Sequence, residues 1–338
     1  MNRIDQLARI AARHRLDDLL VFNEADIRAL TGVECDSACL TPEAFYTDFR
    51  YTAMVRRVAP WLKVRDIRRL KAKGRRVGYC PSISHARFLK LQEAAKGAEF
   101  IDVESDIKAL RMVKTPEEQE GIRAAEKLNV EIWNGAKELF RAGMTEREMA
   151  RTIKRLMIER GDGEAFETIV CVGANAAECH HRPDDTVWNG REPVLVDMGV
   201  KLGGYCSDLT RNLVPKRVRG LYRRVYALVE DANRAAIAAV KPGMTAAKLD
   251  KVARDIIRKG GFGKCFGHSL GHGVGYEIHE APTVSAKSRT VIEPGMIFTI
   301  EPGIYLEGNL GVRIEDMVLV TEDGCEVLSG ADAVSRQK

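Results

Sequence analysis

An internal repeat constrains the fold of this chain more than any other feature of the sequence. Gly143-Met144-Thr145 recurs as Gly243-Met244-Thr245 at an offset of 100 residues, and each copy follows a long alanine-rich stretch with helical patterning. A second helical stretch that ends in a glycine-rich turn comes after each copy. Repeats of solenoid proteins span about 20–50 residues, so this period is too long for a solenoid. The pattern predicts one duplicated, pseudo-two-fold unit of the α+β class over about residues 115–330.

The repeat continues into acidic residues in strand-like apolar segments. In each copy a Glu-Pro pair precedes an apolar run that contains an acid (VLVDMG and FTIEPG), and a glycine lies four residues before a second acid (GYCSD and GVRIE). The duplication therefore pairs Asp197 with Glu301, and Asp208 with Glu315. A single acid of this kind could be a buried carboxylate with its hydrogen bonds satisfied. Four acids related by a pseudo-two-fold axis require a shared cationic partner, and a pair of metal ions is the natural one.

The histidines cluster in the same part of the chain. Five of the seven lie between residues 180 and 279, three of them in the segment GHSLGHGVGYEIHE. His268 and His272 have the i, i+4 spacing of the helical zinc motif H-E-x-x-H, but the surrounding glycines argue against a helix. We expect a loop or strand with close backbone approach. One imidazole with four carboxylates suits two divalent ions better than it suits a closed structural zinc site.

A serine hydrolase is the main rival chemistry. Residues 267–271, GHSLG, fit the G-x-S-x-G motif of the nucleophile elbow. That fold needs an acid and then a histidine after the serine. The last histidine of the chain is His279, and no Asp lies between it and Ser269. We therefore set the serine interpretation aside.

The first 110 residues alternate short apolar runs with helical patterns, which predicts a small α/β domain. The expected elements are helices over residues 4–16 and 84–95 and strands over 19–22, 44–47 and 77–79. Thr115-Pro116-Glu117-Glu118 then predicts a capped helix start, with the helix running to about residue 140, and Thr145 with Glu148 predicts a second capping box. We expect two domains, residues 1–112 and 113–338.

The charge distribution and the cysteine pattern bear on binding partners and on the cellular compartment. The net charge is +5, and the segment 56–76 holds ten Lys or Arg residues and one acid. We interpret this segment as a solvated face rather than a nucleic-acid site, because only Trp61 is interleaved there to stack on bases. The eight cysteines form no C-x-x-C pair, and no signal-peptide pattern or run of ~18 apolar residues occurs. These features predict reduced thiols, no membrane span and a cytoplasmic location.

Four motifs resemble a known family. VDMG…GYCSDLTR, GHSLGHGVGYEIHEAP, TIEPGIY and GVRIEDMVLVTEDG are similar to the signatures of the pita-bread metallopeptidases, in the group of creatinase, prolidase and aminopeptidase P. The segment LLVFNEADIRALTG resembles the creatinase-type N-terminal domain of the proline-specific members, a domain that methionine aminopeptidases lack. The resemblance covers nearly the whole chain. It implies a pita-bread catalytic domain preceded by a smaller creatinase-type α/β domain.

The implied activity is metal-dependent hydrolysis of Xaa-Pro peptide bonds. We expect an Xaa-Pro dipeptidase, or prolidase, because the chain is short and its N-terminal domain is compact. The alternatives are an Xaa-Pro aminopeptidase that acts on longer peptides and a non-catalytic pita-bread binding protein. The resemblance implies a small peptide substrate with proline at its second position, and a homodimer. The expected cofactors are two divalent ions per chain, Mn²⁺ or Co²⁺ in the first place, with Zn²⁺ or Fe²⁺ as alternatives.

The resemblance also assigns site residues. The implied metal ligands are Asp197, Asp208, His272, Glu301 and Glu315, with Asp208 and Glu315 bridging both ions. Creatinase has substituted residues at its ligand positions and uses no metal, whereas all five positions here can hold one. The implied catalytic residues are His180, His279 and Glu301, and the implied substrate-binding residues are His268, Tyr305 and Arg313.

The assignments of His180 and Arg313 leave alternatives open. Before His180, family members often have Leu-Pro, whereas this chain has Glu178-Cys179, so the pocket wall differs there. His181 is adjacent to His180 and should point away from the site in an extended segment, which predicts a structural role. Arg313 could pair either with a substrate carboxylate or with a ligand acid.

Overall fold

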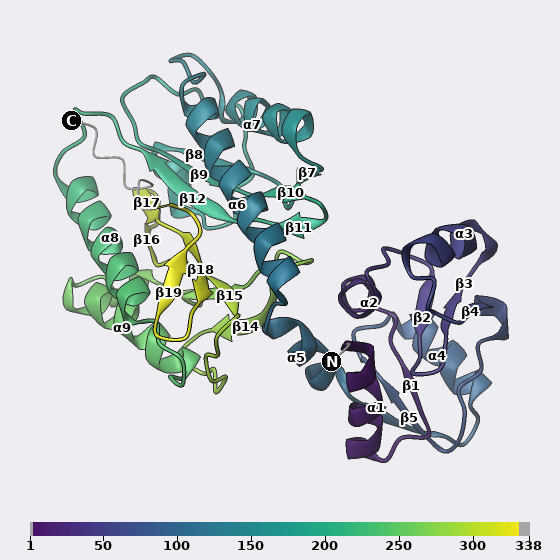
Figure 1. Cartoon of the computed structure of the whole chain (residues 1–338). Helices are drawn as coiled ribbons and strands as arrows, with labels where there is room; N and C mark the ends of the chain where they lie inside the picture. The colour runs from purple at the N-terminus through teal and green to yellow at the C-terminus, as the bar shows by residue number, and fades with distance from the viewer. Residues whose placement is uncertain (1–2, 331–338) are drawn as a thin grey trace. The chain divides into compact units, whose positions relative to one another are not determined.

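A computed structural model describes residues 3–330 of the chain. It divides into two compact units, Met1–Arg111 and Met112–Lys338, which Figure 1 draws in purple to blue and in blue to yellow respectively. Within residues 3–330, no helix is both long enough and apolar enough to cross a membrane.

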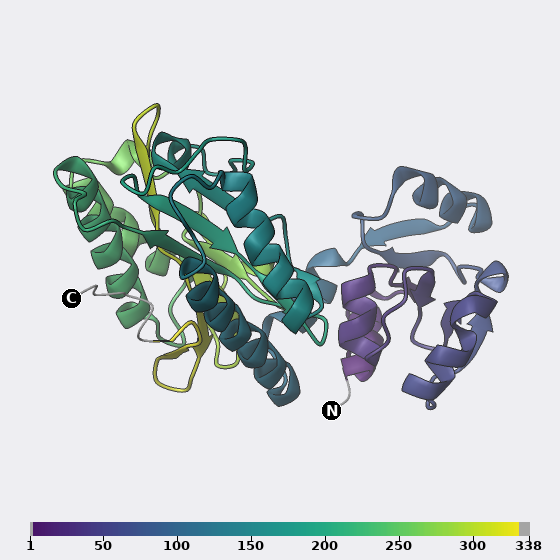
Figure 2. The ribbon, with the colours of Figure 1, turned by 90° about the horizontal axis from the view of Figure 1, so that it is seen from above.

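The first unit is a small α/β domain. Its elements are α1 (Arg3–His14), β1 (Asp18–Leu20), α2 (Glu24–Thr31), β2 (Ala38–Leu40), β3 (Phe45–Thr47), α3 (Phe49–Val58), β4 (Val64–Asp66), β5 (Arg76–Tyr79), α4 (His85–Ala94), β6 (Glu99–Asp102) and α5 (Glu104–Met112). β1, β5 and β6 form a parallel sheet. Leu19 packs with the apolar residues of α1 and α2, whereas Leu20 packs on the other face with Leu91 of α4. Helices therefore cover both faces of this sheet, as Figure 2 shows.

The basic segment 56–76 lies in this unit and is partly neutralised locally. Asp66 accepts from Arg68 at 2.5 Å, and Glu43 pairs with Lys73 at 2.5 Å. Trp61 is about half exposed. The ion pairs agree with a solvated face.

The second unit contains two halves of the same design. The first half comprises α6 (Pro116–Lys137), α7 (Glu146–Arg160), β7 (Gly163–Glu164), β8 (Ile169–Val172), β9 (Val194–Met198), β10 (Val200–Leu202), β11 (Tyr205–Cys206) and β12 (Leu209–Leu213). The second half comprises α8 (Leu221–Ala239), α9 (Ala246–Lys259), β13 (Gly271–Gly273), β14 (Glu280–Val284), β15 (Ile297–Ile300), β16 (Gly303–Leu306), β17 (Leu310–Arg313), β18 (Asp316–Val320) and β19 (Cys325–Val327). In Figure 1 the two helix pairs, α6 with α7 and α8 with α9, flank the strands of the unit.

Strand pairing and turn contacts confirm the predicted duplication. β9 pairs with β12 and β10 with β11 in the first half, and β15 pairs with β18 and β16 with β17 in the second, all antiparallel. The N–H of Gly143 donates to the Trp188 carbonyl at 2.8 Å, and the N–H of Gly243 donates to the Ile292 carbonyl at 2.9 Å. Thr145 forms an antiparallel bridge with Val187, the residue before Trp188, and Thr245 forms one with Val291, the residue before Ile292. The expected helix from Thr115 does form, but it ends at Lys137 rather than near residue 140.

The two threonine caps differ in a way that stability measurements should detect. Thr145 accepts from the Glu148 N–H, and Glu148 accepts from the Thr145 N–H, which completes a capping box on α7. Thr245 caps α9 but has Lys248 at the reciprocal position. We expect Thr145→Ala to destabilise the protein by about 1 kcal/mol, and Thr245→Ala by less. The check is the midpoint of urea unfolding at an unchanged m-value; an equal or larger loss for Thr245→Ala would contradict it.

Candidate metal centre

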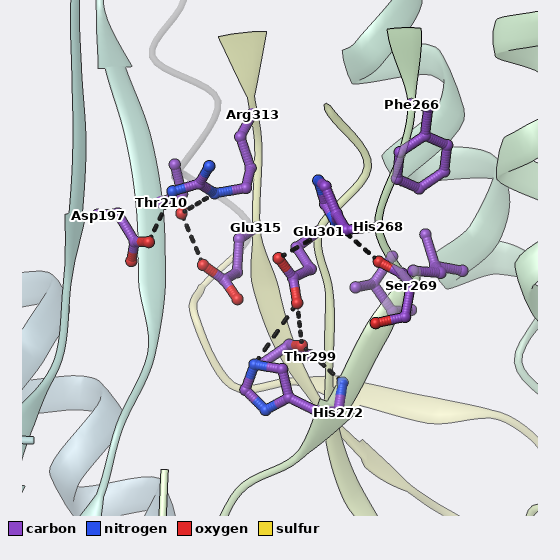
Figure 3. A network of polar contacts seen from close by, with 12 residues as sticks. Asp197, Thr210, Phe266, His268, Ser269, His272, Thr299, Glu301, Arg313 and Glu315 are labelled. Carbon is purple, nitrogen blue, oxygen red and sulfur yellow. Dashed lines mark hydrogen bonds and ion pairs between the residues drawn. The ribbon is translucent and has the colours of Figure 1, made fainter. Parts of the chain in front are cut away.

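The two halves bring their acidic residues to equivalent places. Asp197 lies in β9, and Glu301 directly follows β15, the equivalent strand of the second half. Asp208 directly precedes β12, and Glu315 directly precedes β18. The sequence analysis expected all four acids in strand-like segments, but only Asp197 lies inside a strand. The other three flank strands, and Figure 3 shows the Asp197, Glu301 and Glu315 carboxylates turned toward a common space.

Carboxylate oxygens and one imidazole nitrogen form the centre of this space. The candidate ligand atoms of Asp208, His272 and Glu315 all lie within 4.8 Å of one another. The Nε2 atom of His272 lies 3.5 Å from Oδ2 of Asp208 and 3.5 Å from Oε1 of Glu301. Oδ1 of Asp197 is buried and has no hydrogen-bond partner among the described residues. An orphaned carboxylate oxygen beside three further acids is what an ion-binding centre would leave in the protein alone.

The orientation of His272 suits ligation. Its Nδ1 donates to the Gly273 carbonyl at 3.1 Å, which leaves the Nε2 lone pair facing the carboxylates. Burial lowers the pKa of His272 to about 4, so the ring is neutral at neutral pH. The glycines of β13 permit its position, because a Cβ on Gly271 would lie 1.9 Å from the Thr299 carbonyl oxygen. β13 is thus a strand with close backbone approach, as the sequence predicted.

The electrostatics of three of the acids also indicate that a bound cation would stabilise their ionised forms. Burial raises the pKa of Asp208 and of Glu315 well above the usual range, and the neighbouring carboxylates raise both further. Burial likewise raises the pKa of Glu301 to about 8. Buried like charges cannot all ionise together without a cation. The residues present therefore fit divalent ions, which would hold these carboxylates in their charged form.

Arg313 connects the centre to one wall of the site. Its Nη2 donates to Oδ2 of Asp197 at 2.6 Å, and its Nη1 donates to the Tyr305 hydroxyl at 2.9 Å. Its Nε donates to Oγ1 of Thr210 at 3.0 Å. Of the two partners that the sequence left open for Arg313, the structure shows the ligand acid. Three of the five guanidinium N–H groups are used in this way.

The Tyr305 hydroxyl continues this chain of hydrogen bonds to His268. His268 Nδ1 donates to the Ser269 carbonyl at 2.8 Å, so its Nε2, 3.0 Å from the Tyr305 hydroxyl, accepts from that hydroxyl. Figure 3 shows Glu315 and Glu301 between Arg313 and His268, with Asp197 on the other side of Arg313. The contact between His268 and Ser269 uses the backbone carbonyl rather than the hydroxyl, which gives no support to a serine nucleophile.

His180 and His279 lie at the same site. The His279 ring meets the His272 ring edge to face, with 4.3 Å between the centroids. Burial lowers the pKa of His279 and of His268, and the charge of nearby His180 lowers both further. Cys179 hydrogen-bonds to Tyr305, and burial raises the pKa of its thiol. The thiol therefore forms part of the wall beside Tyr305. All eight cysteines of the chain are free thiols.

The ten predicted site residues thus come together, and their individual roles stay predictions. The sequence analysis missed Thr210, whose hydroxyl donates to Oε2 of Glu315 at 2.6 Å. Thr210 lies in β12, two residues after Asp208, so the two-residue periodicity of a strand was a signal that could have found it.

It also missed polar residues on the buried faces of the long helices. Asn129 donates to the Met198 carbonyl at 3.0 Å, next to Asp197, and Asn233 donates to the Ile300 carbonyl at 3.0 Å, next to Glu301. An asparagine within the apolar stripe of an amphipathic helix was the available signal.

Glu126 supports the first half of the centre in a similar way. It is fully buried on α6 and accepts from the Asp208 N–H at 3.2 Å and from the Ser329 hydroxyl at 2.7 Å. Burial raises its pKa to about 8.

A second group of possible ligands is occupied by hydrogen bonds. Ligand atoms of Glu146, His181 and Asp184 lie within 4.8 Å of one another. Both oxygens of Glu146 already accept two donors each, and both ring nitrogens of His181 face carboxylates. His181 is buried and turned to Glu146, so this group is a network of hydrogen bonds within the protein.

Comparison with known proteins identifies the family. The profile of metallopeptidase family M24 matches residues 120–322, and the Creatinase/Prolidase N-terminal domain matches residues 3–113. The Xaa-Pro dipeptidase of Pyrococcus furiosus is 34% identical over 339 aligned residues, which cover 97% of each chain.

Solved structures agree. The prolidase of Pyrococcus horikoshii superimposes with a TM-score of 0.93 at 30% identity over 98% of each chain. The X-Pro aminopeptidase of Thermotoga maritima superimposes with a TM-score of 0.84 at 30% identity, over 95% of this chain and 97% of that one. Because the catalytic profile spans more than half of the chain and a relative matches it almost end to end, the protein belongs to metallopeptidase family M24.

Proposed function

We propose that this protein is an Xaa-Pro dipeptidase that uses two divalent metal ions. The observation that carries the proposal is the convergence of four carboxylates and the free Nε2 of His272 between the two halves of the catalytic unit. The similarity to the Pyrococcus furiosus Xaa-Pro dipeptidase over nearly the whole chain supports the substrate class. Ions at this centre would polarise the scissile carbonyl and activate water.

The five proposed ligands divide by position. Asp208 and Glu315, which precede equivalent strands, would contact both ions. Asp197 would complete the coordination of one ion, and His272 and Glu301 that of the other. Arg313 holds Asp197 from the side away from its orphaned oxygen, so this oxygen is free to face an ion.

Three residues would serve the reacting peptide. His279 would donate a hydrogen bond to the carbonyl oxygen as negative charge develops on it. Glu301 would pass a proton to the proline nitrogen, which leaves as the amine. His180 would contact the substrate from the exposed side of the site, with His268, Tyr305 and Arg313 lining the pocket. Because proline has no N–H and a fixed φ, such a bond needs a dedicated pocket of this kind.

Substrate length tests the dipeptidase proposal. A dipeptidase must recognise the proline carboxylate. Arg313 donates to Asp197, Thr210 and Tyr305, which leaves two of its five N–H groups. These two groups would provide a cationic contact for the carboxylate. We expect kcat/KM for Ala-Pro to exceed that for Ala-Pro-Ala and for the Ala-Pro amide by well over tenfold, since losing a charge-assisted hydrogen bond costs ~1.5–3 kcal/mol.

Ala-Ala serves as the control for the proline requirement, and it should be hydrolysed poorly. The second candidate function is an Xaa-Pro aminopeptidase, which the similarity to the Thermotoga maritima enzyme favours. Equal or faster turnover of Ala-Pro-Ala would establish that function in place of the dipeptidase.

We further propose Mn²⁺ or Co²⁺ as the ions, a homodimer and a cytoplasmic location. The oxygen-rich ligand set supports the choice of ions, and the free cysteines are consistent with a reducing compartment. Elemental analysis of protein purified without added metal tests the first point, and light scattering tests the second. Cell fractionation tests the third.

A further inference from the structure

His181 makes two contacts that a neutral imidazole cannot satisfy together. Its Nε2 lies 2.8 Å from Oε2 of Glu146, and its Nδ1 lies 3.0 Å from Oε2 of Glu178. An ionised carboxylate only accepts hydrogen bonds, and a neutral imidazole carries one N–H. His181 is 8% exposed, so water cannot easily replace either partner. The doubly protonated ring is therefore the form that satisfies both contacts.

Glu146 fixes the surroundings of this ring. It is the first residue of α7 and is fully buried. Its Oε1 accepts from the Val172 N–H at 2.6 Å and from Nδ2 of Asn175 at 2.9 Å. Its Oε2 accepts from His181 and from the Asp184 N–H at 3.2 Å. One carboxylate thus ties α7 to the end of β8, to the 3₁₀ turn at Gly173–Ala177, and to the segment that follows His180.

We propose that Glu146 and His181 are positioning residues that set the place of His180 in the site. We call the pair the 146–181 clamp. His180 is exposed, whereas His181, the next residue, is buried and bonded to Glu146. Holding His181 by both nitrogens fixes the backbone on which His180 stands. The inference rests on the proposed function, because it concerns a residue that would contact the substrate.

The charges around His181 determine how the 146–181 clamp depends on pH. The groups that face the ring are Glu146 from α7, Glu178 from the segment after the 3₁₀ turn, and Asp184 from the following loop. The nearby cations are paired elsewhere: Arg147 with Asp185 at 3.0 Å and Arg182 with Glu167 at 4.0 Å. The ring therefore meets carboxylates on both sides.

Protonation of His181 is favoured in the folded protein. Burial by itself would lower the pKa of His181, but the hydrogen bonds with Glu178 and Glu146 outweigh it and raise the pKa above its usual value. A pKa that is raised on folding means that the contacts are complete below the unfolded value of about 6.5 and are lost as pH rises through the folded value. His180 should consequently lose its fixed position at alkaline pH.

The first variant removes the charge. His181→Gln has one donor group and can reach only one carboxylate. With both proteins loaded with Mn²⁺ at equal metal content, we expect kcat/KM for Ala-Pro near pH 7 to fall by about tenfold or more, since small misplacements of a catalytic group cost up to about 10²-fold. The alkaline decline expected of the unaltered protein should be absent. His85→Gln, at an exposed position on α4, is the control and should match the unaltered protein within about twofold.

The second variant replaces an exposed carboxylate partner of His181, so that the contact no longer requires a protonated Nδ1. The Glu178 side chain is 75% exposed, and the amide introduced by Glu178→Gln could either donate to or accept from Nδ1 of His181. Glu178→Gln should therefore lower the His181 pKa and keep activity at alkaline pH where the unaltered protein declines. If Glu178→Gln leaves both the pKa and the alkaline decline unchanged, or if His181→Gln reproduces the unaltered profile, the proposal is wrong.

A measurement without substrate separates this proposal from the proposed function. NMR titration of histidine-labelled protein, with the His181 signal assigned by its loss in His181→Gln, gives the pKa directly. A His181 whose measured pKa lies below the ordinary value of about 6.5 overturns the 146–181 clamp, whatever the protein hydrolyses. A raised pKa in a protein that hydrolyses no Xaa-Pro substrate overturns the proposed function instead, and with it the positioning role.

Discussion

Dialysis against a chelator should abolish hydrolysis of Ala-Pro, and added Mn²⁺ or Co²⁺ should restore it. The reason lies in the crowding of Asp197, Asp208, Glu301 and Glu315 around one buried space, where burial and mutual repulsion raise the pKa of three of these carboxyls. Without a metal ion, the raised pKa values of these three carboxyls favour their protonated forms, which are poor ligands and poor bases. The expected loss is the whole of the measurable activity.

Thermal unfolding measures metal binding independently of activity. An ion that binds only the folded protein stabilises it by about 2.7 kcal/mol at a concentration of 100 Kd, so the chelated protein should unfold at a lower temperature. The variant Glu315→Gln should respond less to added metal in both measurements. Full activity in protein shown by elemental analysis to be metal-free would refute the assignment of the centre.

His272→Ala should lose bound metal, whereas His279→Ala should lose only catalytic rate, although the two rings are in contact in the structure. His272→Ala removes the imidazole nitrogen that lies 3.5 Å from both Asp208 and Glu301, so we expect loss of bound metal and of activity. His279→Ala leaves the carboxylates and His272 in place. It should keep its metal but lose kcat by about 10²–10³-fold, as when an oxyanion donor is removed.

The two measurements needed are metal stoichiometry after gel filtration and kcat at saturating Ala-Pro. Each variant is the control for the other, because each removes one imidazole of the same contacting pair of rings. Loss of metal in His279→Ala with retention in His272→Ala would mean that the two roles are reversed.

The features that could be predicted from the sequence are those encoded by residue types at a fixed local spacing. The duplicated Gly-Met-Thr turns, the threonine caps and the repeated acids are local patterns, and the structure forms the corresponding turns and helix starts. The glycines around His272 likewise predicted a strand with close backbone approach, and β13 has that form.

Contacts between distant segments could not be predicted in the same way. Arg313 pairs with Asp197, which is 116 residues earlier in the chain, and Thr210 reaches Glu315 from a neighbouring strand. No local pattern encodes such partners, since they depend on which strands the fold brings together. In the first unit, the sequence predicted β1, β3 and β5 but not β2, β4 and β6, and all six are only three or four residues long. Segments this short carry too little periodicity to be separated consistently from loop.

The duplicated backbone does not make the two halves of the centre equal. The acids from the first half are both aspartates and those from the second half are both glutamates, one methylene longer. A glutamate oxygen reaches about 1.5 Å further from its backbone than an aspartate oxygen, so equivalent backbone positions do not place the four carboxylates symmetrically. His272 adds to the difference, because it comes from the second half and lies 3.5 Å from oxygens of both Asp208 and Glu301. Symmetry therefore holds for the chain path but is broken in the ligands, so the two proposed ions would have chemically distinct environments and would bind with different affinities.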